Sequence, residues 1–160
     1  MRNEQETNLA IEKYADTVRR ICFIHLKNHA EVDDVFQEVF LKYVLNVKPF
    51  ESEAHEKAWF IRVAINACKD VLKNFFRKNV TSFDEMIYEP FYLQEESEVL
   101  GAVMRLPEKY RNVIYLHYYE GYAAVEIAKI LGKRVNTVYT WLDLARKSLR
   151  ESLGGEPNEK

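Results

Sequence analysis

More than any other segment, the stretch of residues 122–150 restricts the fold that this chain can adopt. It predicts two short amphipathic helices joined by a sharp turn at Gly132, where a left-handed backbone costs glycine little. Residues expected to face a core recur at helical spacing: Val125, Ile127, Ala128 and Leu131 in the first helix, and Val135, Val138, Leu142, Ala145 and Leu149 in the second. Because Ala128 is small, the two helices can cross closely. The pattern indicates a helix-turn-helix unit.

The outer face of the predicted second helix is polar, with Asn136, Thr137, Tyr139, Thr140 and Asp143. A helix presented in this way fits the major groove of B-DNA, with its first residues nearest the base edges. Residues 124–150 contain six Lys or Arg and two acidic residues, a net charge of +4, whereas the whole chain has −2. This electropositive segment suits contact with phosphates. The alternative from these residues alone is an αα-hairpin inside an ordinary helical core.

The composition favours a globular, helix-rich protein of one medium or two small domains, because 48% of the 160 residues are apolar and glycine and proline are few. With a net charge of only −2, a DNA-binding protein is expected to bind weakly alone and to need a larger partner. No signal peptide or membrane-spanning run is expected, which predicts a cytoplasmic protein without membrane insertion. Cys22 and Cys68 lie in apolar helical contexts and are expected to be buried thiols.

Helical periodicity dominates the chain and predicts an all-α fold, with helices at about residues 9–26, 32–47 and 55–77. From residue 79 to residue 100 the charged residues are six acidic ones, with no Lys or Arg. Another helical unit begins near Glu98, and Pro107 marks a helix restart. We therefore expect two small helical domains, with these boundaries: 1–78, an acidic flexible linker at 79–97, a helix-turn-helix domain at 98–153, and a disordered tail at 154–160.

Three segments, taken in order, resemble one family. Residues 32–41 read Val-Asp-Asp-Val-Phe-Gln-Glu-Val-Phe-Leu, and residues 58–70 begin Ala-Trp-Phe-Ile-Arg-Val-Ala-Ile-Asn. The third combines Leu-Pro-Glu-Lys-Tyr-Arg at 106–111, Glu-Ile-Ala at 126–128 and Asn-Thr-Val at 136–138. In this order and at these separations, they resemble the extracytoplasmic-function (ECF) group of bacterial RNA polymerase sigma factors, in the sigma-70 family.

The resemblance implies that the second predicted helix binds the polymerase core, at the coiled-coil clamp helices of the largest subunit. The candidate residues are Asp33, Asp34, Gln37 and Glu38. Asp34 and Glu38 are four residues apart and so share a helix face, with Gln37 beside them. Without the resemblance, a solvated helix face would be the simpler interpretation. The polymerase flap is a second contact that the resemblance implies.

The third predicted helix resembles the element that opens the promoter −10 region, where the family holds a flipped, unpaired base near a loop. Polar residues spaced three or four apart form one stripe along it: Arg62, Asn66, Lys69 and Lys73. Such a stripe can follow a phosphate backbone, and Asn66 offers both a donor and an acceptor to a base. The loop at residues 49–55 would supply walls for the base. Trp59 is a possible stacking platform, but we favour a place in the core.

The helix-turn-helix resembles the family's −35 reader. The candidate DNA contacts are Lys133, Arg134, Asn136, Thr137, Tyr139, Thr140, Arg146 and Lys147. Family members usually carry basic residues at the positions of Tyr139, Trp141 and Leu144, whereas this chain has none there and adds Asp143. The change removes contacts that arginine makes with phosphate and guanine. Tyr139 and Trp141 would instead contact thymine methyls or pack on a regulator, and the sequence leaves both open.

Cys22, His25 and His29 share one helix face, but no fourth ligand is evident, so we expect no metal and place both histidines at the surface or rim. No phosphate-binding loop or catalytic triad pattern occurs, and we expect neither a cofactor nor enzymatic activity. The sequence therefore predicts a sigma factor that directs core polymerase to promoters and assists their opening. An anti-sigma factor is an expected partner, because the family is typically held inactive by one. The alternative is a polymerase-independent helix-turn-helix regulator that binds operator DNA.

Overall fold

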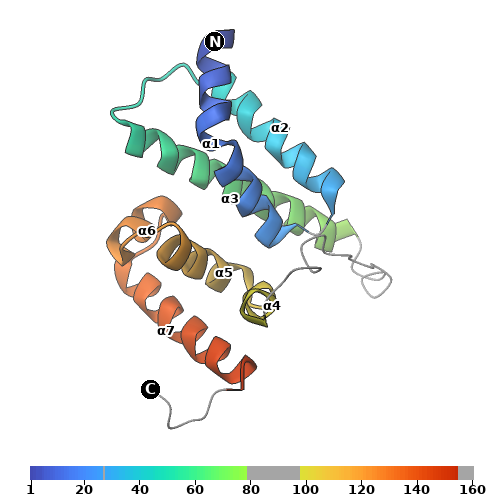
Figure 1. The fold of residues 1–160 in the computed structure, drawn as a ribbon, viewed down its shortest axis with the longest axis vertical. Helices are drawn as coiled ribbons and strands as arrows, with labels where there is room; N and C mark the ends of the chain where they lie inside the picture. The colour runs from blue at the N-terminus through green and yellow to red at the C-terminus, as the bar shows by residue number, and fades with distance from the viewer. Residues whose placement is uncertain (27, 79–97, 155–160) are drawn as a thin grey trace. The chain divides into compact units, whose positions relative to one another are not determined.

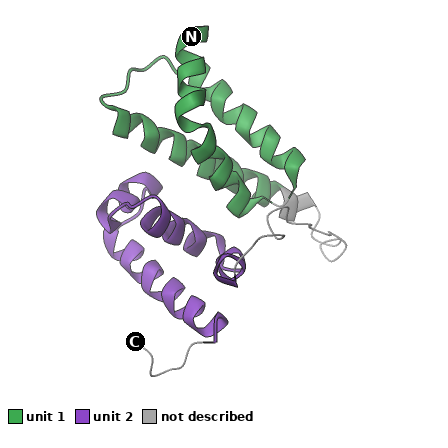
Figure 2. Cartoon of the chain, in the orientation of Figure 1, with its two compact units in different colours: residues 1–91 green, residues 92–160 purple. Residues whose placement is uncertain are grey.

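The structure is a computed structural model that describes residues 1–26, 28–78 and 98–154. Over these residues it contains helices and no strand, which confirms the predicted all-α fold (Figure 1). The chain divides into two compact units, residues 1–91 (unit 1) and residues 92–160 (unit 2), coloured separately in Figure 2. The predicted linker, residues 79–97, and residues 155–160 of the predicted tail lie outside the described residues.

Unit 1 is built from α1 (Glu4–His25), α2 (His29–Leu45) and α3 (Glu53–Lys78), and each helix contacts the other two. Asn3 and Asn28 cap the first two helices, because each side-chain oxygen accepts a hydrogen bond of 2.8 Å from the backbone N–H three residues later. These caps explain why both helices begin about three to five residues earlier than the apolar periodicity predicted.

An aromatic cluster lies at the centre of unit 1. The ring of the fully buried Phe60 lies 4.7 Å from that of Tyr14, and 5.1 Å from those of Phe40 and Tyr43. Trp59 is half-buried and meets Phe60 edge-on at 5.0 Å, so it packs at the border of the core. The three helices also contribute buried aliphatic residues to the core: Val18, Ile21, Val32, Val35, Val39, Ile61, Ala64 and Ile65. Stacked and edge-on rings at these distances add to the stability from buried area.

A carboxylate of α3 ties all three helices together. Glu56 accepts a hydrogen bond of 3.0 Å from the Tyr14 hydroxyl of α1 and one of 3.2 Å from the Tyr43 hydroxyl of α2. Burial, and then the neighbouring Glu56, raise the pKa of both tyrosines above its ordinary value. The three side chains hold both hydroxyls in their neutral, donating form.

The prediction that His25 lies at the surface or rim is wrong. His25 is only 1% exposed, because it continues the buried face of α1 that carries Ile21 and Cys22. His29, at the start of α2, is exposed as expected. Cys22 and Cys68 are buried, and both are free thiols. Among the described residues, no group of three or more His, Cys, Asp or Glu side chains is placed to hold a metal ion.

Unit 2 comprises four α-helices and a π-helical turn in the part that the structure describes: α4 (Glu98–Met104), α5 (Glu108–Ile114), η3 (Tyr115–Tyr119), α6 (Ala124–Leu131) and α7 (Val135–Ser152). Helix α7 packs against α4, α5 and α6. Pro107 is the N-cap of α5, one residue before its first turn. The π-helix extends α5 and ends where the Glu120 N–H bonds to the Tyr115 carbonyl at 3.1 Å. It was not predicted, because no residue pattern distinguishes it from α-helix.

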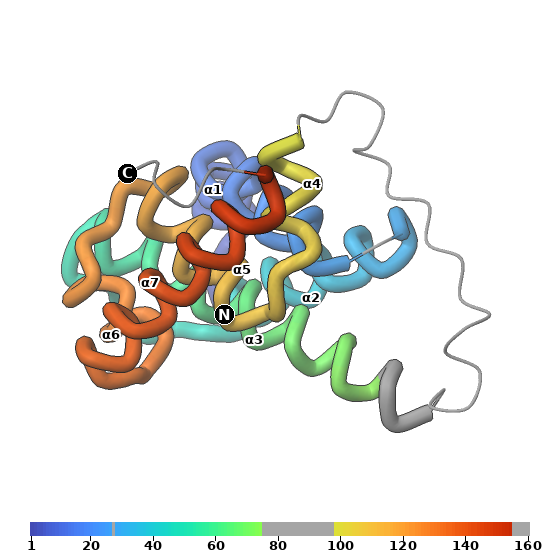
Figure 3. Tube along the Cα trace, turned by 90° about the horizontal axis from the view of Figure 1, so that it is seen from below, coloured from blue at the N-terminus to red at the C-terminus, as the bar shows by residue number. Residues whose placement is uncertain are grey.

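The helix-turn-helix is formed by α6 and α7, which Figure 3 traces as one continuous path through the turn. Gly132 has the predicted left-handed backbone, with φ 68° and ψ 38°. Of the predicted core residues, some are buried as expected: Ile127, Ala128, Val138, Leu142 and Ala145. Three are half-buried: Leu131, Val135 and Leu149. Val125 was predicted wrongly, since it is 52% exposed and Ala124 takes the buried position three residues before Ile127.

Candidate functional site

The predicted polymerase-binding residues lie on the exposed surface of α2: Asp33, Asp34, Gln37 and Glu38. Asp33 lies 3.8 Å from Arg19 of α1, and Glu38 lies 3.1 Å from Lys42 of its own helix. Asp34 and Gln37 make no hydrogen bond or ion pair within the described ranges. The face therefore presents both paired and unengaged polar groups to a partner.

The same face of α2 continues into two exposed leucines that the sequence reasoning missed. Leu41 is 58% exposed and lies four residues after Gln37, and Leu45, four residues further, is 60% exposed. Their spacing from Gln37 was a signal that could have revealed them. An acidic patch bordered by apolar side chains of one helix is a surface suited to packing on another protein.

The predicted −10 stripe lies along one face of α3. Asn66, Lys69 and Lys73 are exposed, and Arg62 is half-buried. None of the four makes an ion pair within the part of the chain that the structure describes. Among the described residues, the stripe is therefore a row of three cations without an ion-pair partner beside one amide, which suits a single nucleic-acid strand.

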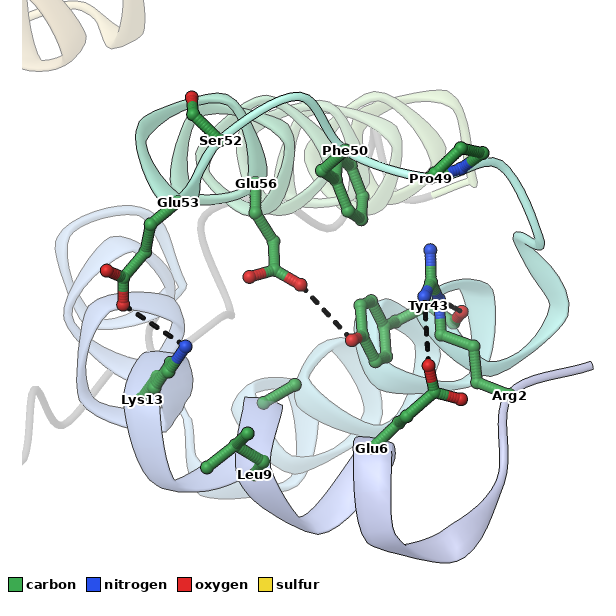
Figure 4. A pocket seen from close by; sticks show the side chains of 11 residues that line it. Arg2, Glu6, Leu9, Lys13, Tyr43, Pro49, Phe50, Ser52, Glu53 and Glu56 are labelled. Atoms are coloured by element: carbon green, nitrogen blue, oxygen red, sulfur yellow. Dashed lines mark hydrogen bonds and ion pairs between the residues drawn. The ribbon is translucent and has the colours of Figure 1, made fainter.

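A pocket of about 490 Å³ opens beside this stripe's helix, between α1, α2 and the loop before α3 (Figure 4). Its lining residues are Arg2, Glu6, Leu9, Ala10, Lys13, Tyr43, Pro49, Phe50, Ser52, Glu53 and Glu56. The loop at residues 49–55 contributes walls, as expected, but none of the four stripe residues of α3 lines the pocket. The four stripe residues therefore lie outside the pocket, although the stripe and the loop were both expected to engage the −10 strand.

Arg2 holds the pocket's loop in place. Its guanidinium donates to the carbonyls of Tyr43 at 3.2 Å and of Lys48 at 2.7 Å, and it lies 4.4 Å from the centre of the Tyr43 ring. Figure 4 shows that the pocket's carboxylates also have partners, with Glu53 3.2 Å from Lys13. Sequence reasoning missed Arg2, because a residue before the first helix has no periodic pattern.

The predicted −35 residues gather at the turn and along α7. Most of them are exposed: Lys133, Arg134, Asn136, Tyr139, Thr140 and Lys147. Thr137 and Arg146 are half-buried. Trp141 is also half-buried, and the ammonium groups of Lys109 and Lys133 lie 5.4 and 5.9 Å from its ring centre. Trp141 is therefore a platform for two cations, an arrangement that favours nearby phosphates.

Comparison with known proteins matches both units to one family. The family model described as "Sigma-70 region 2" matches residues 10–79, and the model described as "Sigma-70, region 4" matches residues 96–149. The ECF RNA polymerase sigma factor SigW of Bacillus subtilis is 25% identical over 89% of this chain and 86% of its own length. The sigma factor SigV of the same organism is 28% identical over 86% of this chain and 84% of its own. The chain belongs to the ECF group of the sigma-70 family.

This sigma factor directs RNA polymerase in transcription initiation, and the family consists of initiation factors, not enzymes. Its fold matches a solved structure, that of the sigma factor RpoE in complex with the anti-sigma factor NepR from Bartonella quintana. The TM-score is 0.77 at 19% identity, with 93% of this chain and 97% of that chain covered. Within the described residues, no helix is long and apolar enough to cross a membrane.

Proposed function

We propose that this sigma factor divides its task among three surfaces: α2 binds core polymerase, α3 and the neighbouring pocket engage the opened −10 strand, and α7 reads the −35 element. The domain boundaries that we propose are 1–78 for the first two tasks, 79–97 for an acidic linker and 98–153 for the third. The observation that carries the proposal is the α2 face, where two polar side chains without a described partner adjoin two leucines that are more than half exposed.

The α2 face fits the clamp helices of the largest polymerase subunit. Asp33, Asp34 and Glu38 offer carboxylates to basic side chains of a partner helix, and Gln37 adds a donor and an acceptor. Leu41 then supplies the apolar contact that an interface centre needs, since charge alone adds little affinity when it stays exposed to water.

The pocket beside α3 suits an unpaired base of the −10 element. Its volume of about 490 Å³ lies within the range of small-molecule pockets, and Tyr43 and Phe50 give it aromatic walls. The cations of the α3 stripe would hold the strand's phosphates, and Asn66 would bond to a second base. Unpairing a base costs a few kcal/mol, which these contacts would offset.

Helix α7 is proposed to enter the major groove at −35, with Lys133, Arg134 and Lys147 on phosphates and Asn136 and Thr140 toward bases. Contact of this unit with the polymerase flap completes the assembly. An anti-sigma factor as a further partner is supported by the B. quintana RpoE–NepR complex. Because polymerase acts in the cytoplasm, we place this factor there too, without an enzymatic activity of its own.

Run-off transcription tests the proposed function. Purified core polymerase is assayed on a candidate promoter with and without the full chain, and defined start sites are expected only when the chain is present. A transcript pattern that is unchanged by the chain, together with operator binding that needs no polymerase, would support the rival polymerase-independent regulator.

Promoter opening separates the α3 surface from the α2 surface. The Asn66→Ala variant should lower the permanganate reactivity of unpaired −10 thymines while its affinity for core polymerase stays unchanged. Asp70→Ala, at an exposed position of the same helix, is the matched control. Equal opening by Asn66→Ala and the unmodified chain would refute the role given to Asn66.

A further inference from the structure

The guanidinium of Arg146 on α7 is held by two partners inside unit 2. Its Nε donates to the Tyr118 hydroxyl at 2.6 Å, and its Nη1 donates to Asp143 Oδ1 at 3.0 Å. The same guanidinium lies 5.7 Å from the centre of the Tyr118 ring. Arg146 therefore orients two side chains, the Asp143 carboxylate of its own helix and Tyr118 of the π-helix.

Asp143 points outward from this network. Its side chain is 77% exposed, while that of Arg146 is 38% exposed. Only one of its two carboxylate oxygens bonds to Arg146, so the other stays available to an outside donor. A surface ion pair of this kind adds little stability, but a bond to a guanidinium that Tyr118 also holds limits how the carboxylate can turn.

The face of α7 that precedes Asp143 carries no cation, and the next exposed one, Lys147, lies four residues after it. Asn136, Tyr139 and Thr140 lie seven, four and three residues before Asp143 and share its exposed side of α7. Between Arg134 and Lys147 the only basic residue is Arg146, which is engaged as described. Asp143 is therefore an acceptor in the middle of the reading face, and no guanidinium between Arg134 and Lys147 is free to bond guanine.

Whether a base can bond to such an acceptor depends on the groups that its edge presents in the major groove. Adenine and cytosine present an exocyclic amino group, which a carboxylate can accept from, whereas guanine presents only the acceptors O6 and N7. A fixed carboxylate that faces guanine places its oxygen against the O6 and N7 acceptors of the base. Neither side then has a donor, and the affinity for that base falls.

We propose that Asp143, oriented by Arg146 and Tyr118, rejects guanine at one base of the −35 element and selects a base with an amino group there, adenine or cytosine. This inference rests on the proposed reading of −35 DNA by α7. It makes Asp143 a specificity-determining residue, and it makes Arg146 a positioning residue for Asp143.

A promoter library tests the proposal. The −35 region is randomised, each template carries a barcode in its transcribed part, and core polymerase with the full chain transcribes the pool. The unmodified chain should show one position at which guanine is depleted on the order of tenfold relative to adenine or cytosine. Asp143→Asn keeps the shape but supplies an amino donor, so guanine should be accepted at that position and preferences elsewhere should stay unchanged.

Two further variants distinguish a positioning role from a general loss of folding. Tyr118→Phe removes the bond to Arg146 and should weaken guanine rejection at the same position alone. Glu151→Gln, which neutralises an exposed carboxylate near the end of α7, should leave the profile unchanged. Equal guanine tolerance in the unmodified chain and Asp143→Asn would overturn the inference while leaving −35 reading intact. Transcription that does not depend on the −35 sequence would overturn both.

Discussion

At the scale of single residues, Glu56 carries the polar connection of unit 1, because it accepts from one hydroxyl on α1 and one on α2. Glu56→Ala should lower the free energy of unfolding by about 1–3 kcal/mol, since Tyr14 and Tyr43 lose their acceptor. The measurement is urea unfolding followed through Trp59 fluorescence in a Trp141→Phe background. Glu12→Ala, at an exposed position of α1, is the control and should change stability by less than about 0.5 kcal/mol. Equal losses in the two variants would contradict the bridging role.

Tyr14 should make the stability of unit 1 fall in alkali. Burial, and then Glu56, raise its pKa above the ordinary value of 10.0, so the folded state keeps a proton that the unfolded state releases. Its contribution is therefore complete below about pH 10 and declines as the pH rises above that value. Urea unfolding between pH 8 and pH 11 should show this slope, and Tyr14→Phe should reduce it but leave the part that Tyr43 contributes, since the pKa of Tyr43 is also raised. A slope as steep in Tyr14→Phe as in the unmodified chain would assign it to other groups.

Predictions for single residues were confirmed where the required backbone conformation strongly favours one residue type. Only glycine suits the sharp turn between two amphipathic helices, and Gly132 adopts the expected left-handed backbone. They failed where neighbouring positions compete for one buried face. The smaller Ala124, and not Val125, occupies the buried position in α6, and His25 is buried despite its polar ring. Packing decides such cases, and periodicity alone does not distinguish them.

At the scale of elements, the turn between α6 and α7 depends on a backbone that other residues rarely adopt. A Cβ at Gly132 would meet nothing within 4 Å, so the cost of Gly132→Ala comes from φ +68° alone. We expect a loss of about 1–2 kcal/mol in unfolding free energy, measured by urea unfolding through Trp141 fluorescence in a Trp59→Phe background. Gly101→Ala in α4, where φ is ordinary, should be neutral or stabilising. Similar losses at both glycines would contradict this account of the turn.

The exposed face of α2 should affect polymerase binding without affecting the fold. Asp34→Ala combined with Glu38→Ala is expected to weaken the affinity for core polymerase by about 5- to 30-fold, or 1–2 kcal/mol, and Leu41→Ala should weaken it separately. The dissociation constants are measured with labelled full chain, and Glu12→Ala serves as control. Unchanged affinity in both test variants, with normal folding, would refute the assignment of this face.

The sequence predicted which helices form more accurately than it predicted where each helix begins. Apolar spacing located α1, α2 and α3, but it placed the starts of α1 and α2 late, because capping by Asn3 and Asn28 is polar and adds no periodic signal. The π-helix at Tyr115–Tyr119 had no signal at all. The pocket was only partly predictable, since the loop could be named but Arg2 comes from a different part of the chain.

At the scale of the whole molecule, the two units carry different surfaces: an acidic and apolar one on α2, and a basic turn with a polar helix face on α7. Family and fold class could be predicted, because three motifs in order span both units, and the comparisons confirm them. The site residues themselves remain predictions. The small net charge of −2 means that the chain alone offers little attraction to DNA, so the polymerase must supply the rest.

Promoter binding with and without core polymerase tests this central claim most directly. The affinity of the full chain for a duplex promoter fragment is measured by fluorescence anisotropy at physiological salt, for the chain alone, for core alone and for both together. We predict weak and barely selective binding by the chain alone, and tight, promoter-selective binding only when core is present. Tight binding of the duplex by the chain alone, with no association between the chain and core polymerase, would contradict the account.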